Sequence, residues 1–226
     1  MPVRFEPFIN NSLYHIFTRS IDSKVIFAQE LYLKLFLEIM RYYRSSKTKI
    51  SFSYLPRLKK EELAIVLKEI YYHKYFRVEI LAYCLMPTHF HLLVKQKKER
   101  GISRFISDVL NSFTRYYNIK NKRKGPLFLP RFKSSSIGSD DILLHVSRYI
   151  HLNPYSSGTI KSIGNLIEYP WSSFPTYSRE ESVDDLITSQ EILSLFDSDK
   201  RKYRKFVFDN ANYQRTLEAV KYAEKW

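Results

Sequence analysis

The apolar segment from Tyr83 to Val94 restricts the fold of this chain more than any other feature of its sequence. It falls within two runs of strand-forming residues, Tyr75 to Leu85 and His89 to Lys95, which are separated only by Met86 to Thr88. Such a short separation predicts two paired strands. Their apolar character predicts that they lie in the core.

Two histidines lie at the start of the second strand. Side chains alternate between the faces of a strand, so His89 and His91 should project from one face and Phe90 from the other. Two imidazoles side by side can bind one divalent metal ion. The same spacing also occurs in surface or structural histidines, and the spacing alone leaves both interpretations open.

A second informative segment, Arg148 to Pro154, follows a strong helix start. Ser139 can cap the helix, and Asp140 and Asp141 favour its first turn because they carry negative charge. Apolar residues then recur at helical spacing, at Ile142, Leu143, Val146 and Ile150. We therefore expect an amphipathic helix across this region.

Tyr149 and Asn153 are four residues apart in this expected helix, so a phenol and a carboxamide share one face. Pro154 should end the helix near Asn153, because a residue before proline disfavours helical geometry. The two side chains could form part of a site. Equally, Tyr149 could be a core aromatic residue and Asn153 a C-terminal cap.

The other regular elements follow from hydrophobic periodicity. Strands are expected at Ser12 to Arg19 and Leu127 to Ser136, and helices at Ala28 to Arg44, Glu61 to His73 and Ile102 to Asn121. The segment from Thr48 to Arg57 stays unassigned because Pro56 disfavours a long strand. With one inserted helix, the order is βαββαβ, which predicts an α+β fold: an antiparallel sheet covered by helices.

The chain is strongly basic, with 37 Lys and Arg against 23 Asp and Glu and a net charge of +14. A polyanion is therefore the expected partner. From Val109 to Ser139 there is no acidic residue, and the basic ones are Arg115, Lys120, Lys122, Arg123, Lys124, Arg131 and Lys133. Aromatic residues lie between them, at Tyr116, Tyr117, Phe128 and Phe132. This pattern favours nucleic-acid binding, with phosphates neutralised and unpaired bases stacked; a solvated basic helix end beside core aromatics is the alternative.

The chain contains one cysteine, Cys84, so an internal disulfide is excluded and a reducing compartment is favoured. Cys84 is expected to be a small core residue. No stretch of about eighteen apolar residues indicates a membrane span, and the first six residues carry no signal-peptide pattern. We expect a cytoplasmic protein.

Four motifs occur together in a fixed order between about Leu13 and Tyr177. The first is His-hydrophobic-His (HUH) at 89–91, within YCLMPTHFHLLV, and the second is FTRYYNIKNKRKGPLFLPRFKSS. RYIHLNP follows, and then YPWSS at 169–173. The set resembles the single-tyrosine HUH transposases of the IS200-like family, particularly those associated with repetitive extragenic palindromes (REP).

The resemblance implies a ferredoxin-like fold with a specific site. His89 and His91 match the metal-binding histidines, Asn153 matches the third, polar ligand, and Tyr149 matches the nucleophile. The expected metal is Mg²⁺ or Mn²⁺, and two imidazoles suit Mn²⁺ better. The expected product is a 5′-phosphotyrosine linkage with a free 3′-hydroxyl, formed on a single-stranded or hairpin DNA.

Some positions depart from the family pattern. Thr88 stands where the family usually has Asn, which affects a turn or a contact behind the metal ligands. Pro126 and the pair Leu129 and Pro130 replace the more usual GHLFQGRF wording, which affects DNA contacts. None of these changes removes a proposed catalytic group.

The composition changes after Tyr177, which predicts a nuclease domain at 1–177 and a helical C-terminal extension at 178–226. Arg179 to Asp199 contains seven acidic residues and one basic residue, and Lys200 to Trp226 is charged with a helical pattern. The extension could brace the Tyr149 helix, mediate dimerisation or block the basic groove. The sequence leaves these open, together with the choice between monomer and homodimer.

These observations predict a metal-dependent single-stranded DNA endonuclease and strand transferase, with Arg148 beside the nucleophile as a further DNA contact. Two alternatives remain. One is a non-catalytic, domesticated nucleic-acid-binding protein on the same fold. The other is a phosphodiesterase in which water attacks in place of Tyr149, which would give product without a covalent adduct.

Overall fold

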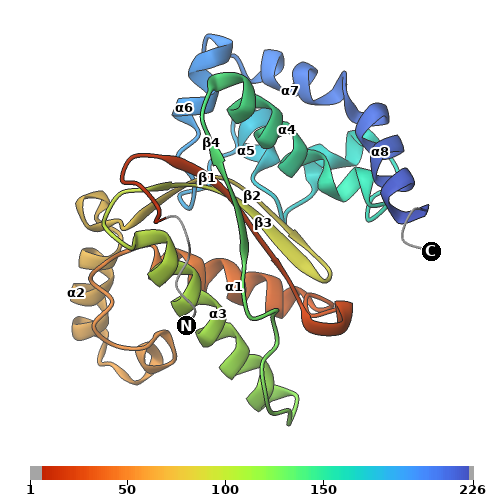
Figure 1. The fold of residues 1–226 in the computed structure, drawn as a ribbon. Coiled ribbons are helices and arrows are strands. Elements are labelled where there is room, and N and C mark those ends of the chain that lie inside the picture. The colour runs from red at the N-terminus through yellow and green to blue at the C-terminus, as the bar shows by residue number, and fades with distance from the viewer. Residues whose placement is uncertain (1–6, 224–226) are drawn as a thin grey trace.

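The protein is described here over residues 7–223 by a computed structural model (Figure 1). Residues 1–6, where no signal peptide was expected, and 224–226, at the end of the predicted extension, lie outside that range. A four-stranded antiparallel sheet with the order β2-β3-β1-β4 forms its centre. The strands are β1 (Leu13–Arg19), β2 (Val78–Met86), β3 (His89–Gln96) and β4 (Lys133–Ile137).

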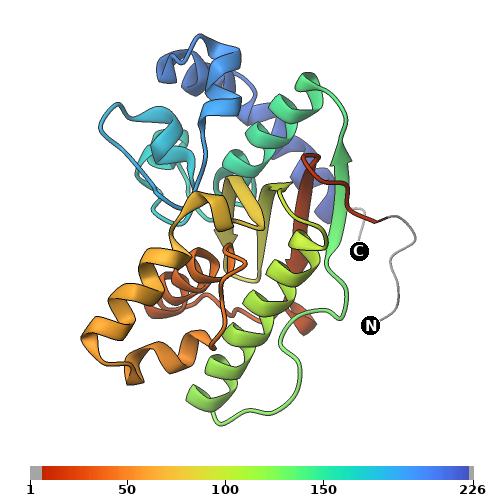
Figure 2. The same ribbon diagram turned by 90° about the vertical axis from the view of Figure 1, so that its left-hand side faces the viewer.

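Helices cover both faces of the sheet, as Figure 2 shows. One face packs against α1 (Glu30–Tyr43) and α3 (Gly101–Lys120), with α2 (Lys60–Ile70) beside them. The other face packs against α4 (Asp140–Ser156). The later helices lie on the same side of the sheet as α4, and α7 and α8 contact it (Figure 1); these helices are α5 (Phe174–Ser178), α6 (Gln190–Leu193), α7 (Lys200–Phe208) and α8 (Ala211–Ala223). Short 3-10 helices occupy Ile21–Ser23, Phe52–Arg57, His73–Tyr75, Ile163–Glu168 and Ser194–Phe196.

The predicted fold class is confirmed. The order β1, α1, β2, β3, α3, β4 is the βαββαβ pattern, with α2 as the inserted helix. The strand predicted over Leu127 to Ser136 is confirmed only in its second half, because β4 begins at Lys133. Before it, Phe128 forms an isolated bridge to Ser20. Pro130, which has no backbone N–H for a ladder, lies between that bridge and the strand.

The prediction that helix α4 ends near Asn153 is wrong, because α4 continues through Pro154 to Ser156. Proline removes one backbone hydrogen bond but does not prevent a further turn when packing favours it. Tyr155 and Ser156 are buried in that turn. Ser157 N–H then donates to the Asn153 carbonyl at 3.0 Å and closes the helix.

The outer edge of β2 is covered by later parts of the chain. Leu85 N–H donates to the Trp171 carbonyl at 2.8 Å, and Ser173 N–H donates to the Tyr83 carbonyl at 3.0 Å. Thr188 N–H donates to the Ile80 carbonyl at 2.8 Å. The YPWSS motif therefore pairs with an edge strand that would otherwise present free backbone groups.

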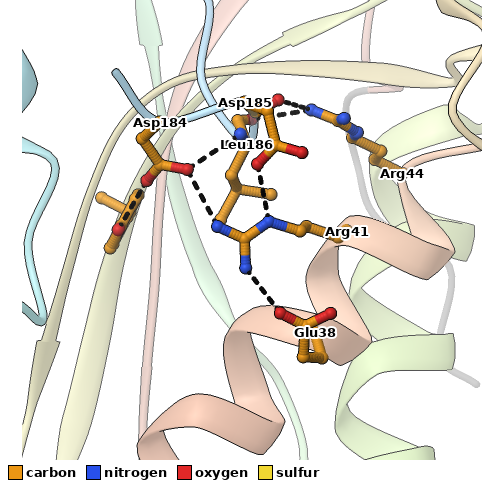
Figure 3. A network of polar contacts seen from close by, with 7 residues as sticks. Glu38, Arg41, Arg44, Asp184, Asp185 and Leu186 are labelled. Carbon is orange, nitrogen blue, oxygen red and sulfur yellow. Dashed lines mark hydrogen bonds and ion pairs between the residues drawn. The ribbon is translucent and has the colours of Figure 1, made fainter. Parts of the chain in front are cut away.

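A charged segment, residues 184–186, which we call the strap, connects the edge of the sheet to α1 (Figure 3). Asp184 accepts from Arg41 at 2.9 Å and from the Tyr83 hydroxyl at 2.8 Å, and Asp185 accepts from Arg41 at 2.8 Å. Arg44 donates to the Asp185 carbonyl at 2.6 Å. These contacts join the acidic stretch after Tyr177 to a helix more than a hundred residues earlier in the chain.

None of the helices within residues 7–223 combines the length and the apolar character needed to cross a membrane.

Candidate functional site

A cavity of about 310 Å³ lies between the sheet and α4. Its walls include the two histidines of β3, three residues of α4 and basic residues before and within β4. The lining residues are Phe17, Thr18, Arg19, His89, His91, Leu129, Arg131, Lys133, Tyr149, Asn153, Ser156, Ser157 and Glu218. All four residues proposed for metal binding and catalysis therefore line one cavity, together with two of the predicted DNA contacts.

His89 and His91 project into the cavity because they alternate with Phe90, which is fully buried on the opposite face. The two imidazole centroids are 5.2 Å apart. Burial, with a smaller contribution from the charge of Arg19, lowers the pKa of His89 to about 4. Burial also lowers the pKa of His91, with smaller contributions from His15, His89 and Arg19. Both rings are therefore neutral at pH 7, which is the form that binds a metal.

Each of these histidines uses its Nδ1 atom in a hydrogen bond. His89 Nδ1 is 3.0 Å from the Thr88 hydroxyl, so the residue that replaces the family's usual Asn contacts the predicted ligand directly. His91 Nδ1 is 3.0 Å from Nε2 of His15. In each histidine, Nε2 is therefore the ring atom that remains to bind a metal ion in the cavity.

His15, on β1, is a site residue that the sequence reasoning missed. Its ring lies 5.2 Å from that of His91 and 5.9 Å from that of Tyr149, measured between centroids. It is 8% exposed, and burial lowers its pKa to about 4. In the sequence, His15 was marked only by its alternation with Phe17 and Arg19 on the expected first strand. No local pattern indicated which strand would pair with that strand and so place His15 beside His91.

Tyr149 and Asn153 share one face of α4, as their spacing predicted, and both line the cavity. The Tyr149 ring lies 5.5 Å from the His91 ring between centroids. Asn153 is 5% exposed, and its Nδ2 donates to the Tyr149 carbonyl at 2.8 Å. That hydrogen bond uses the amide nitrogen of Asn153, so Oδ1 is the atom suited to a metal.

The opposite side of α4 is held by a buried polar network. His151, two residues after Tyr149 in α4, is fully buried. Its ring nitrogens lie 2.7 Å from the Tyr203 hydroxyl and 2.8 Å from the Ser173 hydroxyl. Tyr203 also donates to Ser147 at 3.1 Å. These contacts fix the rotation of α4, and so they fix the direction in which Tyr149 points.

The donor set fits a divalent metal ion. Two neutral imidazole nitrogens and one amide oxygen leave further positions open for phosphate and water. Within residues 7–223, no three His, Cys, Asp or Glu residues form a group that could hold a metal ion. A site at His89 and His91 would therefore need a third protein ligand of another kind, and the amide of Asn153 lines the same cavity.

The predicted DNA-binding residues divide into three groups. Arg131 and Lys133 line the cavity, together with Arg19, which the sequence analysis did not single out. Arg148 lines a neighbouring cavity of about 300 Å³ between α4 and α8. The others lie along α3 or in the turn after it and line neither cavity; they are Arg115, Lys120, Lys122, Arg123 and Lys124.

The prediction that the interleaved aromatic residues stack on DNA bases is wrong for two of the four. Tyr117 and Phe128 are about 5% exposed and pack in the core beneath α1 and α3. Tyr116 and Phe132 are half-buried against the same cluster. Their apolar surface is used mainly to cover the sheet. Leu129, one of the departures from the family wording, is exposed and lines the candidate cavity instead.

Two further residues, Cys84 and Glu218, lie close to the candidate site. Cys84 is fully buried opposite His91 on β2, and burial raises the pKa of its thiol, so it is the core residue expected from the sequence. Glu218 of α8 lines both cavities, as does Tyr149. The end of the chain thus contributes to the walls around Tyr149, which sequence spacing could not indicate.

Comparison with known proteins relates the chain to transposases. Residues 47–153 match the model of a family described as "Transposase IS200 like", a stretch that contains His89, His91, Tyr149 and Asn153. No curated protein sequence matches the chain significantly.

A solved structure of a REP-associated tyrosine transposase bound to a REP hairpin is similar to this chain, with a TM-score of 0.54 and 16% sequence identity. The similarity covers 83% of this chain and 92% of the other. At this identity the similarity establishes the shared fold. Together, the two findings show that residues 47–153 are similar to IS200-like transposases, as the motifs indicated, and that the chain shares the fold of a REP-associated tyrosine transposase.

Proposed function

We propose that this protein is a metal-dependent single-stranded DNA endonuclease and strand transferase, with Tyr149 as its nucleophile. The observation that carries the proposal is the arrangement in one cavity of Tyr149, His89, His91 and Asn153, with Arg19, Arg131 and Lys133 in the walls. The match of residues 47–153 to IS200-like transposases supports the same chemistry.

His89 and His91, through their Nε2 atoms, and Asn153, through Oδ1, would hold Mn²⁺ or Mg²⁺. Such an ion offsets negative charge on the scissile phosphate. The phenol of a tyrosine has a reference pKa of about 10, so at neutral pH it is a poor nucleophile unless its position is favourable. The buried network behind α4 supplies that positioning, because it prevents the Tyr149 backbone from rotating away from the cavity.

The reaction exchanges one phosphoester for another. The Tyr149 oxygen attacks the phosphorus and loses its proton to solvent, while the bond to the 3′ oxygen breaks and that oxygen gains a proton. The products are a 5′-phosphotyrosine linkage and a free 3′-hydroxyl. Because the number of phosphoester bonds is unchanged, a second 3′-hydroxyl can reverse the step and join two strands without ATP.

The substrate we propose is a DNA strand with a hairpin. Arg19, Arg131 and Lys133 line the cavity and can neutralise phosphates there. The similar solved structure holds a REP hairpin. That similarity supports a hairpin beside the cleaved single strand as the recognised element.

A covalent-adduct assay tests this proposal. Labelled single strands from the DNA flanking the gene are mixed with the protein and Mn²⁺, and products are separated on a denaturing gel. We expect a shifted protein–DNA band that EDTA abolishes and that Tyr149→Phe removes. Tyr54→Phe, which changes an exposed tyrosine that lines neither cavity, should retain the band. Cleavage without the band would favour attack by water, and tight binding without cleavage would favour a non-catalytic binding protein.

A further inference from the structure

We propose that His15 is a positioning residue that holds His91 in the one tautomer able to bind a metal ion. The inference rests on the proposed function, because it concerns the same site. His15 lies outside residues 47–153, so the family match assigns it no role. Its contact with His91 comes from the pairing of β1 with β3.

Strand register brings the two histidines together. β1 and β3 are antiparallel neighbours, and Phe17 of β1 lies opposite His91. His15 is two residues from Phe17, so its side chain leaves the same face of the sheet. The His15 and His91 rings lie nearly parallel, at 20°, and Nε2 of His15 is 3.0 Å from Nδ1 of His91.

A hydrogen bond between two neutral imidazoles needs one N–H donor and one lone-pair acceptor. If His15 were the donor, His91 would accept at Nδ1 and carry its own proton on Nε2, where it would block metal binding. If His91 donates from Nδ1–H to Nε2 of His15, the lone pair on Nε2 of His91 is free. Metal binding therefore requires His15 to be the acceptor.

The neighbouring histidine shows why this contact matters more for His91. His89 Nδ1 pairs with the Thr88 hydroxyl, which can rotate to donate or to accept. A hydroxyl therefore adapts to either tautomer of His89. An imidazole has one defined donor and one defined acceptor, so His15 couples its own tautomer to that of His91. The burial of both rings keeps water from replacing this contact.

Two substitutions at His15 separate its hydrogen bond from its volume. His15→Phe keeps a flat ring in the same space but removes the acceptor. His15→Gln retains a carbonyl oxygen near the position of Nε2. His73→Phe, at an exposed histidine outside the site, is the matched control. The measured quantity is Mn²⁺ affinity of the full chain without DNA, from titration of the free Mn²⁺ signal in electron paramagnetic resonance.

We expect His15→Phe to weaken Mn²⁺ binding by about 10–100-fold, the usual effect of losing a hydrogen bond behind a metal ligand. His15→Gln should restore most of the affinity, and His73→Phe should change nothing. Long-range ¹H–¹⁵N spectra of the metal-free protein should show the His91 proton on Nδ1. His15→Phe should reduce the population of that tautomer.

Three outcomes would overturn the proposal, and they are distinguishable. Unchanged Mn²⁺ affinity in His15→Phe would remove the positioning role but leave the metal site. Equal losses in His15→Phe and His15→Gln, with the Nδ1–H tautomer of His91 unchanged, would show that His15 acts only through packing. A wild-type protein that binds no Mn²⁺ would overturn the proposed function itself, and the role of His15 with it.

Discussion

The two faces of the central sheet carry different kinds of residue on the same strand. On the α1 and α3 side, Phe90 is fully buried and its ring lies 5.0 Å from that of Phe36 and 6.1 Å from that of Phe128, between centroids. On the α4 side, His89 and His91 line a cavity. Phe90 therefore contributes to the core, and its two sequence neighbours, His89 and His91, contribute to the candidate site.

The aromatic face of the sheet therefore positions the polar site, whereas the polar site adds little to the stability of the fold. The aromatic cluster holds β3 and β1 in place, so the positions of His15, His89 and His91 follow from packing on the far side of the sheet. His89 is only partly buried, at the cavity wall. Substitutions on the two faces should therefore affect different measurements, and four predictions test that separation.

The largest effect is expected for His89→Ala. Loss of one metal ligand should lower metal-dependent cleavage by roughly a thousandfold, because a bound metal contributes several kcal/mol to transition-state stabilisation. The melting temperature should stay close to that of the wild type, because His89 lies at the cavity wall. Cleavage rates and a thermal melt on the same preparation measure both. A large loss of stability in His89→Ala would contradict the expected separation between the stabilising face of the sheet and the face that carries the site.

Phe90→Ala should have the converse effect. Removing a fully buried ring beside Phe36 and Phe128 should lower the free energy of unfolding by about 3–5 kcal/mol. Denaturant unfolding followed by circular dichroism measures this change. At a temperature where the variant is still folded, Mn²⁺ binding should persist. Complete loss of Mn²⁺ binding in a folded Phe90→Ala variant would show that the core also determines the geometry of the metal site.

Basic residues allow the same comparison for DNA binding. The double variant Arg131→Ala and Lys133→Ala should weaken binding of single-stranded DNA on the order of tenfold, and should lower the slope of log affinity against log salt by about 1.4. Its counterpart, Arg115→Ala with Lys120→Ala on α3, removes the same charge from outside the cavity. Fluorescence anisotropy at several salt concentrations distinguishes the two. Equal effects would show that DNA also follows α3.

The smallest effect is expected at the strap of Figure 3. Asp184→Asn removes the charge that pairs with Arg41 and should lower the free energy of unfolding by about 1 kcal/mol, with no change in Mn²⁺ affinity. Glu30→Gln, which removes an exposed ion pair with Lys34 on α1, should give no measurable change. A change in Mn²⁺ affinity for Asp184→Asn would link the strap to the site.

Local patterns were sufficient for part of this architecture. The alternation around Phe90 predicted which face His89 and His91 share, and helical spacing predicted that Tyr149 and Asn153 share another. The contact of His15 with His91 depends on strand register between residues 76 positions apart, which no local pattern contains. The turn beyond Pro154 likewise depends on burial of Tyr155, a tertiary effect that overrides the local preference.

The covered edge of β2 also affects how the chain folds during synthesis. β2 is complete at Met86, whereas its outer partners at Trp171 and Ser173 follow about 85 residues later. At a translation rate of about 5–20 residues per second, that edge stays unpaired for roughly 4–17 s. A nascent chain released before Trp171 would carry an exposed edge strand, and such edges recruit other chains. The last quarter of the protein therefore protects the edge of β2 only once it has been made, and the growing chain is exposed to aggregation until then.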